Sequence, residues 1–162
     1  MKKIGNLIFI IVIGVSLMVT FMGCSFGNKD NKSNSLTAED VLEKITKNID
    51  EPSQMDIKSD FFDDNYGIDK SILKSYGVRV PIGDESASEC AVFQVKNKKD
   101  IDKVEAGIKK RSKILKDIWS KYNTDQYELV KSSKVVIEGN YVLFVVSQNA
   151  DKIEENFKEI TK

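Results

Sequence analysis

The sequence of 162 residues contains no histidine, and this absence excludes several kinds of chemistry at once. Catalysis by a Ser-His-Asp triad or by a Cys-His pair needs an imidazole ring, and so do zinc sites with histidine ligands. Cysteine is scarce as well, with only Cys24 and Cys90 in the chain. If Cys24 is acylated, Cys90 has no partner, and the domain must then fold without a disulfide.

Neither sign of charge dominates the chain, which carries 25 basic and 25 acidic side chains. Removing the first 23 residues takes away Lys2 and Lys3, which leaves 23 basic against 25 acidic side chains and a net charge of −2. A protein that binds bulk nucleic acid has a clear basic excess. We therefore expect no nucleic-acid partner.

The chain begins with two lysines, Lys2 and Lys3, followed by an apolar run from Leu7 to Met22 and then by Gly23 and Cys24. This is the layout of a signal peptide. The run is longer than the 7 to 15 residues of a typical cleaved signal and shorter than the roughly 20 that span a bilayer. Its length is therefore compatible with a cleaved signal and with an uncleaved membrane anchor. The small residue directly before the cysteine resembles the lipobox of bacterial lipoproteins.

The lipobox resemblance implies that the thiol of Cys24 receives a diacylglycerol and that the signal is cut before it. Residues 1–23 are then the signal peptide, and residues 24–35 are the lipidated cysteine with a polar tether. Two acyl chains anchor a protein firmly where one binds reversibly. Residues 36–162 have no internal repeat and form one small domain. We expect it on the extracytoplasmic face of the cell membrane.

Patterning within residues 36–162 predicts an α+β domain with a largely antiparallel sheet. Thr37 and Asp40 form a capping box at the start of a first helix, which ends before Pro52. The later elements are a short helix at 69–74, an extended piece at 76–82, a strand at 87–96, a helix at 99–122, strands at 133–138 and 141–147, and a helix at 151–160. After the first helix the order is therefore β-β-α-β-β-α.

Gly139 and Asn140 make a two-residue turn between the strands at 133–138 and 141–147, which predicts a hairpin. Both strands of this hairpin are apolar at successive positions, so both faces of the sheet need a cover. Ile137, Val142, Phe144 and Val146 share one face, and Val136, Leu143 and Val145 share the other. We expect the long helix and the C-terminal helix to cover one face and the first helix to cover the other. If the first helix lies elsewhere, the uncovered face is a binding surface.

Several segments carry a resemblance to a known family: "DDNYGID", "YGVRVP", "SASECAVFQVK", "IWSKY" and "IEGNYVLFVVS". Over roughly residues 66–160 the chain resembles the domain of unknown function 4358 family, which occurs in small lipoproteins of low-GC Gram-positive bacteria. The resemblance implies a shared fold and a lipoprotein leader. It implies no known activity, cofactor or catalytic residue.

Arg111 is a charged residue within the apolar stripe of the long helix, which is formed by Ile101, Val104, Ile108, Leu115, Ile118 and Tyr122. Such a residue needs a partner. One interpretation is a structural ion pair, with Glu89 at the start of the preceding strand as the partner. The other is a guanidinium fork for a carboxylate or phosphate ligand, with Trp119 or Tyr122 as aromatic contacts.

Two further patterns favour ordinary structural roles. Cys90 lies within an apolar strand, where a buried, unreactive thiol is expected. The segment "DDNYGID" resembles a calcium loop only faintly, because counting from Asp63 puts Ile68 where the glycine belongs and Lys74 where the bidentate glutamate belongs. No metal site is predicted.

A basic face on the long helix is formed by Lys109, Lys110, Lys113 and Lys116. Interspersed acidic residues favour a solvated surface. A basic face close to a membrane can also meet lipid headgroups or an anionic wall polymer.

These observations predict a non-catalytic, lipid-anchored module that binds a protein or another component of the cell envelope. The alternative is an envelope hydrolase that uses carboxylates such as Asp63 or Glu89. A deep pocket with several carboxylates would favour the hydrolase, and a flat exposed apolar face would favour the binding module. We assign no catalytic residue and no cofactor from the sequence.

Overall fold

The computed structural model describes residues 36–57 and 59–162, so Cys24, the predicted signal peptide and the tether lie outside the described residues. The helices are α1 (Ala38–Thr46), α2 (Ser59–Asn65), α3 (Ile101–Tyr122), α4 (Thr124–Lys131) and α5 (Ala150–Thr161). The strands are β1 (Gln54–Asp56), β2 (Leu73–Pro81), β3 (Glu89–Val95), β4 (Lys134–Glu138) and β5 (Tyr141–Val146). Two 3-10 turns, η1 (Lys70–Ile72) and η2 (Lys98–Asp100), precede β2 and α3.

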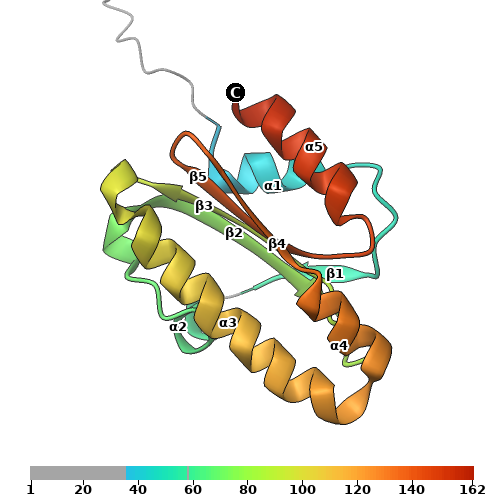
Figure 1. Ribbon diagram of the computed structural model, residues 1–162. Helices are drawn as coiled ribbons and strands as arrows, with labels where there is room; N and C mark the ends of the chain where they lie inside the picture. The colour runs from blue at the N-terminus through green and yellow to red at the C-terminus, as the bar shows by residue number, and fades with distance from the viewer. Residues whose placement is uncertain (1–35, 58) are drawn as a thin grey trace, which may run out of the picture. The chain divides into compact units, whose positions relative to one another are not determined.

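The five strands form one sheet in the order β1-β2-β3-β5-β4, and every neighbouring pair is antiparallel. Two-residue loops suit antiparallel neighbours, and β4 and β5 are joined by Gly139 and Asn140, with Gly139 at a φ of 61°. The predicted α+β class and the antiparallel sheet are therefore confirmed. Figure 1 shows the sheet between two layers of helices.

The helix α1 begins with the capping box that the sequence predicts. The Thr37 side chain accepts a hydrogen bond from the Asp40 backbone N–H at 3.1 Å, and the Asp40 carboxylate accepts one from the Thr37 N–H at 3.0 Å. The helix ends at Thr46 because Lys47 has an extended backbone. Ile49 nevertheless packs against the core from the following loop.

The helices α1 and α5 cover one face of the sheet together, whereas α2, α3 and α4 cover the other (Figure 1). Leu143 and Val145 pack under α1 and α5, and Val142, Phe144 and Val146 pack under α3. The expected cover by the first helix is thus present, but the expectation that α5 shares the face of α3 is wrong. At about 1.5 Å per residue α3 is roughly 33 Å long, and with α2 and α4 it already occupies that face.

Three short elements were not predicted. The strand β1 pairs with β2 at one edge of the sheet, and α4 follows directly after α3. The helix α2 occupies part of the "DDNYGID" segment, and a turn at Gly67, whose φ is 64°, follows it. The predicted helix at 69–74 is shorter than expected, because only η1 is helical and β2 already begins at Leu73.

The C-terminal end of α3 departs from the predicted apolar stripe. Val104, Ile108 and Leu115 are buried as expected, but Ile118 is 43% exposed and Tyr122 is 79% exposed. Trp119 takes their place against the core. Within residues 36–57 and 59–162, no helix has both the length and the apolar character needed to cross a bilayer.

Candidate functional site

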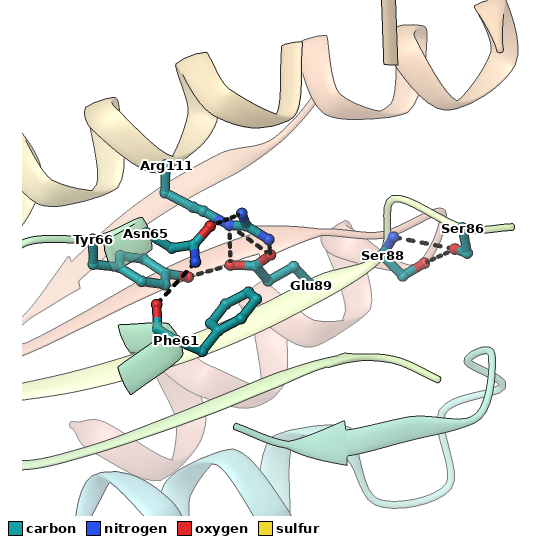
Figure 2. A network of polar contacts seen from close by, with 7 residues as sticks. All are labelled: Phe61, Asn65, Tyr66, Ser86, Ser88, Glu89 and Arg111. Carbon is teal, nitrogen blue, oxygen red and sulfur yellow. Dashed lines mark hydrogen bonds and ion pairs between the residues drawn. The ribbon is translucent and has the colours of Figure 1, made fainter. Parts of the chain in front are cut away.

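Arg111 of α3 and Glu89 of β3 form an ion pair beneath the helix (Figure 2). The Nη2 atom of Arg111 lies 2.6 Å from Glu89 Oε2, and its Nε lies 3.0 Å from both carboxylate oxygens. The two side chains are 8% and 1% exposed. The apolar stripe therefore places the guanidinium in the core, and the first residue of β3 supplies the charge that balances it.

Tyr66 is a third member of this cluster, which we call the Glu89 network. Its hydroxyl donates a hydrogen bond to Glu89 Oε1, and its ring packs against Phe62 and Phe93. Burial and then the negative charge of Glu89 raise the pKa of the Tyr66 hydroxyl well above its usual value. The hydroxyl is therefore a fixed donor to the carboxylate.

The other side of the guanidinium is held by α2. Arg111 Nη1 donates a 2.6 Å hydrogen bond to Asn65 Oδ1, and the Asn65 amide donates at 2.9 Å to the Phe61 carbonyl. The Phe61 ring lies 5.0 Å from the guanidinium carbon, close enough for a cation–π contact. The Nε–Nη2 edge that would fork an external carboxylate already binds Glu89. The geometry therefore favours the structural interpretation of Arg111.

A hollow of about 500 Å³ opens beside the Glu89 network, between α3 and the β2–β3 loop. We call it the α3 hollow. Its lining residues are Phe61, Val80, Pro81, Gly83, Asp84, Ser86, Ala87, Ser88, Glu89, Arg111, Leu115, Ile118, Trp119 and Tyr122. The structure thus brings together the four residues named in the two interpretations of Arg111, namely Arg111, Glu89, Trp119 and Tyr122.

A second hollow of about 610 Å³ lies on the other side of the same loop. It shares Pro81, Ser86 and Ser88 with the α3 hollow, and its remaining lining is mostly polar. These other residues are Asp50, Glu51, Pro52, Ser53, Ile82, Glu85, Gln126, Leu129, Gln148 and Asn149. The walls of the two hollows therefore differ, since the α3 hollow alone has aromatic walls.

The two carboxylates considered for hydrolysis are not brought together. Asp63 pairs with Lys70 at 2.8 Å with more than half of its side chain exposed, and it does not line the α3 hollow. Glu89 accepts hydrogen bonds from Arg111 and Tyr66, so its oxygens are already engaged. The acid pair that general acid–base hydrolysis needs is not assembled from these residues.

Cys90 lies on the other face of β3, within the core under α1 and α5. Burial, followed by the negative charge of Glu51, raises the pKa of its thiol far above the usual range. The thiol stays protonated at neutral pH, which makes it a poor nucleophile.

The basic face predicted on α3 is largely solvated. Lys109, Lys110 and Lys113 are exposed, whereas Lys116 is half-buried. Lys110 donates to the Asp64 carbonyl at 2.8 Å. No cluster of three or more Cys, Asp or Glu side chains suited to a metal ion occurs among the described residues.

Sequence reasoning missed Tyr66, Asn65 and Phe61, which complete the surroundings of Arg111. All three lie in or beside α2, a helix that was not predicted. The available signal was the pair of adjacent aromatic residues before "DDNYG", because exposed turns seldom carry that much apolar surface.

Comparison with family models matches residues 47–147 to the domain of unknown function DUF4358. The match begins in the loop after α1 and ends just after β5, so it includes the Glu89 network and the α3 hollow. It starts earlier than the resemblance noted in the sequence and stops before α5. The searches of curated proteins and of solved structures returned no match.

Proposed function

The chain belongs to the DUF4358 family, and we propose that its domain is a non-catalytic binding module held at the outer face of the cell membrane by a lipid on Cys24. The partner is a segment of an envelope protein that inserts apolar side chains into the α3 hollow. The carrying observation is that Ile118 and Tyr122, two large exposed apolar side chains, stand at the wall of this hollow.

Exposure of these two side chains is unusual within α3, because the other apolar residues of its stripe face the core. Tyr122 is 79% exposed, which leaves most of its ring available to a partner, and Tyr and Trp are enriched at the centres of protein interfaces. The buried ion pair of Arg111 and Glu89 also lines the hollow, and it holds the wall in place while its two charges balance each other. Such a site suits an apolar segment with few charges.

The role of Arg111 in this proposal is to position the wall. It ties α3 to β3 through Glu89 and to α2 through Asn65, so the three elements around the hollow keep their spacing. Sites of this kind bind best when the surrounding side chains are preorganised. The basic face of α3 is a secondary candidate surface for anionic headgroups or wall polymer, at about 1 kcal/mol per charge near a membrane.

Site-specific photocrosslinking in living cells tests the binding site. A photoreactive amino acid placed at Ile118 or Tyr122 should give one discrete adduct with an envelope protein. Met55 is the matched control, because it is a 49% exposed apolar residue on β1 at the sheet edge and lines neither hollow. An adduct of equal yield at Met55, or none at 118 and 122, would refute the site.

The anchor has a separate test. Cells labelled with radioactive palmitate should incorporate the label into the wild type and not into Cys24→Ser, and the variant should leave the membrane fraction. If the serine variant stays wholly in the membrane fraction, the segment Leu7 to Met22 acts as an uncleaved span instead.

A further inference from the structure

The strand β4 lies at one edge of the sheet and pairs with β5 alone among the described strands. Its side chains at Val135 and Ile137 are 44% and 42% exposed, which is high for a strand in a sheet covered on both faces. An exposed apolar edge strand is a template for pairing with another strand. We infer that β4 pairs antiparallel with β4 of a second copy of this chain, which makes a continuous ten-stranded sheet across a two-fold axis.

The backbone N–H and C=O groups of β4 point in the directions that this pairing needs. Glu138 and Tyr141 flank the two-residue turn, so they form a hydrogen-bonded pair, and Val136 with Leu143 is the next such pair. The backbone groups of Val135 and Ile137 therefore point away from β5, toward the edge. An antiparallel second copy centred on Val136 sets Val135 opposite Ile137, and these two residues then exchange hydrogen bonds in both directions.

The charges of β4 are self-complementary in the same register. Its sequence Lys-Val-Val-Ile-Glu places Lys134 of one copy opposite Glu138 of the other, and the two-fold axis repeats this contact. A parallel pairing in register would set like charges against each other. The single strand thus carries opposite charges at its ends and apolar residues between them, which selects the antiparallel arrangement.

Lys134 has a donor to spare for this contact. Its ammonium group donates to Asp151 and, at 2.6 Å, to Glu154 of α5. Lysine has three N–H donors, so one remains. Lys158 also contacts Glu154 at 2.6 Å, so two lysines balance the two acids on this surface. Glu138 forms no ion pair with another described residue, and it is free to meet Lys134 of the second copy.

Disulfide trapping of the full chain in detergent micelles tests this pairing. In the proposed register the two Val136 residues face each other as a non-hydrogen-bonded pair, with Cα atoms about 4.5 Å apart, which suits a disulfide. Val136→Cys should therefore give a covalent dimer under mild oxidation. Met55→Cys on β1, the opposite edge of the sheet, is the matched control, and the unmodified chain gives the background.

Charge reversal then tests the register. Glu138→Lys, combined with Val136→Cys, should lower the dimer yield about tenfold, because two like-charged pairs replace two opposite pairs. Mixing that chain with one carrying Lys134→Glu and Val136→Cys should restore the yield. Circular dichroism of each variant verifies that it is folded.

Three results would overturn the inference. The first is a dimer yield for Val136→Cys no higher than for Met55→Cys. The second is a yield that Glu138→Lys leaves unchanged. The third is a dimer whose disulfide, located by peptide mapping, does not join position 136 of the two copies.

Discussion

The two faces of the sheet each hold a buried polar network that begins on β3, and the two networks differ in charge. Under α3, Glu89 accepts from Arg111 and Tyr66. Under α1 and α5, the Gln94 amide donates to the Tyr141 hydroxyl at 2.9 Å, and Ser75 donates to the Gln94 carbonyl oxygen at 3.0 Å. One network is ionic and the other is neutral, although both occupy alternate faces of the same strand.

The two networks also fasten different helices. The Gln94 network fixes the start of α1, because Tyr141 donates to the Leu36 carbonyl at 2.5 Å and the Ala38 N–H donates to Ser75 at 2.7 Å. The Glu89 network fixes α2 and the middle of α3, beside an open hollow. The comparison indicates that a neutral network suffices to dock a short capped helix, whereas the ion pair occurs beside the open α3 hollow.

The largest expected effect comes from breaking the ionic network. Glu89→Gln leaves the guanidinium of Arg111 buried without a full counter-charge, so we expect a loss of about 3 to 5 kcal/mol in the free energy of unfolding. Gln94→Met on the other face breaks hydrogen bonds to the neutral hydroxyls of Ser75 and Tyr141 and should cost about 1 to 3 kcal/mol. Urea denaturation measures both, and equal losses would contradict the distinction.

A double-mutant cycle tests whether that loss comes from the contact between Arg111 and Glu89. The double variant Arg111→Met, Glu89→Gln should lose less free energy of unfolding than the two single variants lose in sum. The reason is that the second change removes a charge that the first left unpaired. The coupling energy comes from four denaturation curves. A coupling energy of zero would remove Glu89 as the partner of Arg111.

The two tyrosines offer a sharper comparison of the two networks. Tyr66→Phe removes a hydrogen bond to a charged group and should cost about 1.5 to 3 kcal/mol. Combined with Tyr141→Phe, its effect should be additive within about 0.5 kcal/mol, because the two networks lie on opposite faces of the sheet. Combined with Glu89→Gln, it should not be additive. Additivity in both combinations would show that Tyr66 acts independently of Glu89.

A pH-dependent effect belongs to the α5 side of the molecule. Hydrogen bonds from Lys134 and then Lys158 lower the pKa of Glu154 to about 2, from an ordinary value of 4.5. A lowered folded-state pKa gives stability that is complete above about pH 4.5 and is lost as the pH falls toward 2. The stability difference between the wild type and Glu154→Gln should therefore shrink over that interval in urea denaturation at several pH values. A stability difference that stays constant with pH would contradict the lowered pKa of Glu154.

The smallest effect is expected at the rim of the α3 hollow. Tyr122→Ser should change the free energy of unfolding by less than about 0.5 kcal/mol, because the side chain is mostly exposed. Thermal unfolding checks this directly. A loss of several kcal/mol would show that Tyr122 supports the fold and is not available to a partner.

The sequence predicted the sheet well because its signals were long or chemically specific. The apolar run of β3, the β4–β5 hairpin with Gly139, and the capping box at Thr37 each leave few alternatives. The strand β1, with three residues and no apolar alternation, has no such signal and forms only because β2 offers an edge. The side of α5 depended on how much room α3 and α2 leave, which is a matter of tertiary packing.

The candidate site was predictable in part for the same reason. A charge within an apolar stripe demands a partner, and the start of the preceding strand supplied Glu89. Tyr66 and Asn65 could not be found in this way, since nothing in the pattern of α2 shows which side chains face the ion pair. The exposure of Ile118 and Tyr122 could not be predicted from the apolar stripe, because Trp119 packs against the core in their place.

The most direct test of the central claim combines binding and stability in one variant. The photoreactive amino acid is placed at Ile118, and its adduct yield in cells is compared with and without Tyr122→Ser, while the unfolding of the purified protein is measured in parallel. We predict that the adduct is largely lost and that the free energy of unfolding stays within about 0.5 kcal/mol. An undiminished adduct would contradict the claim that the α3 hollow binds the partner.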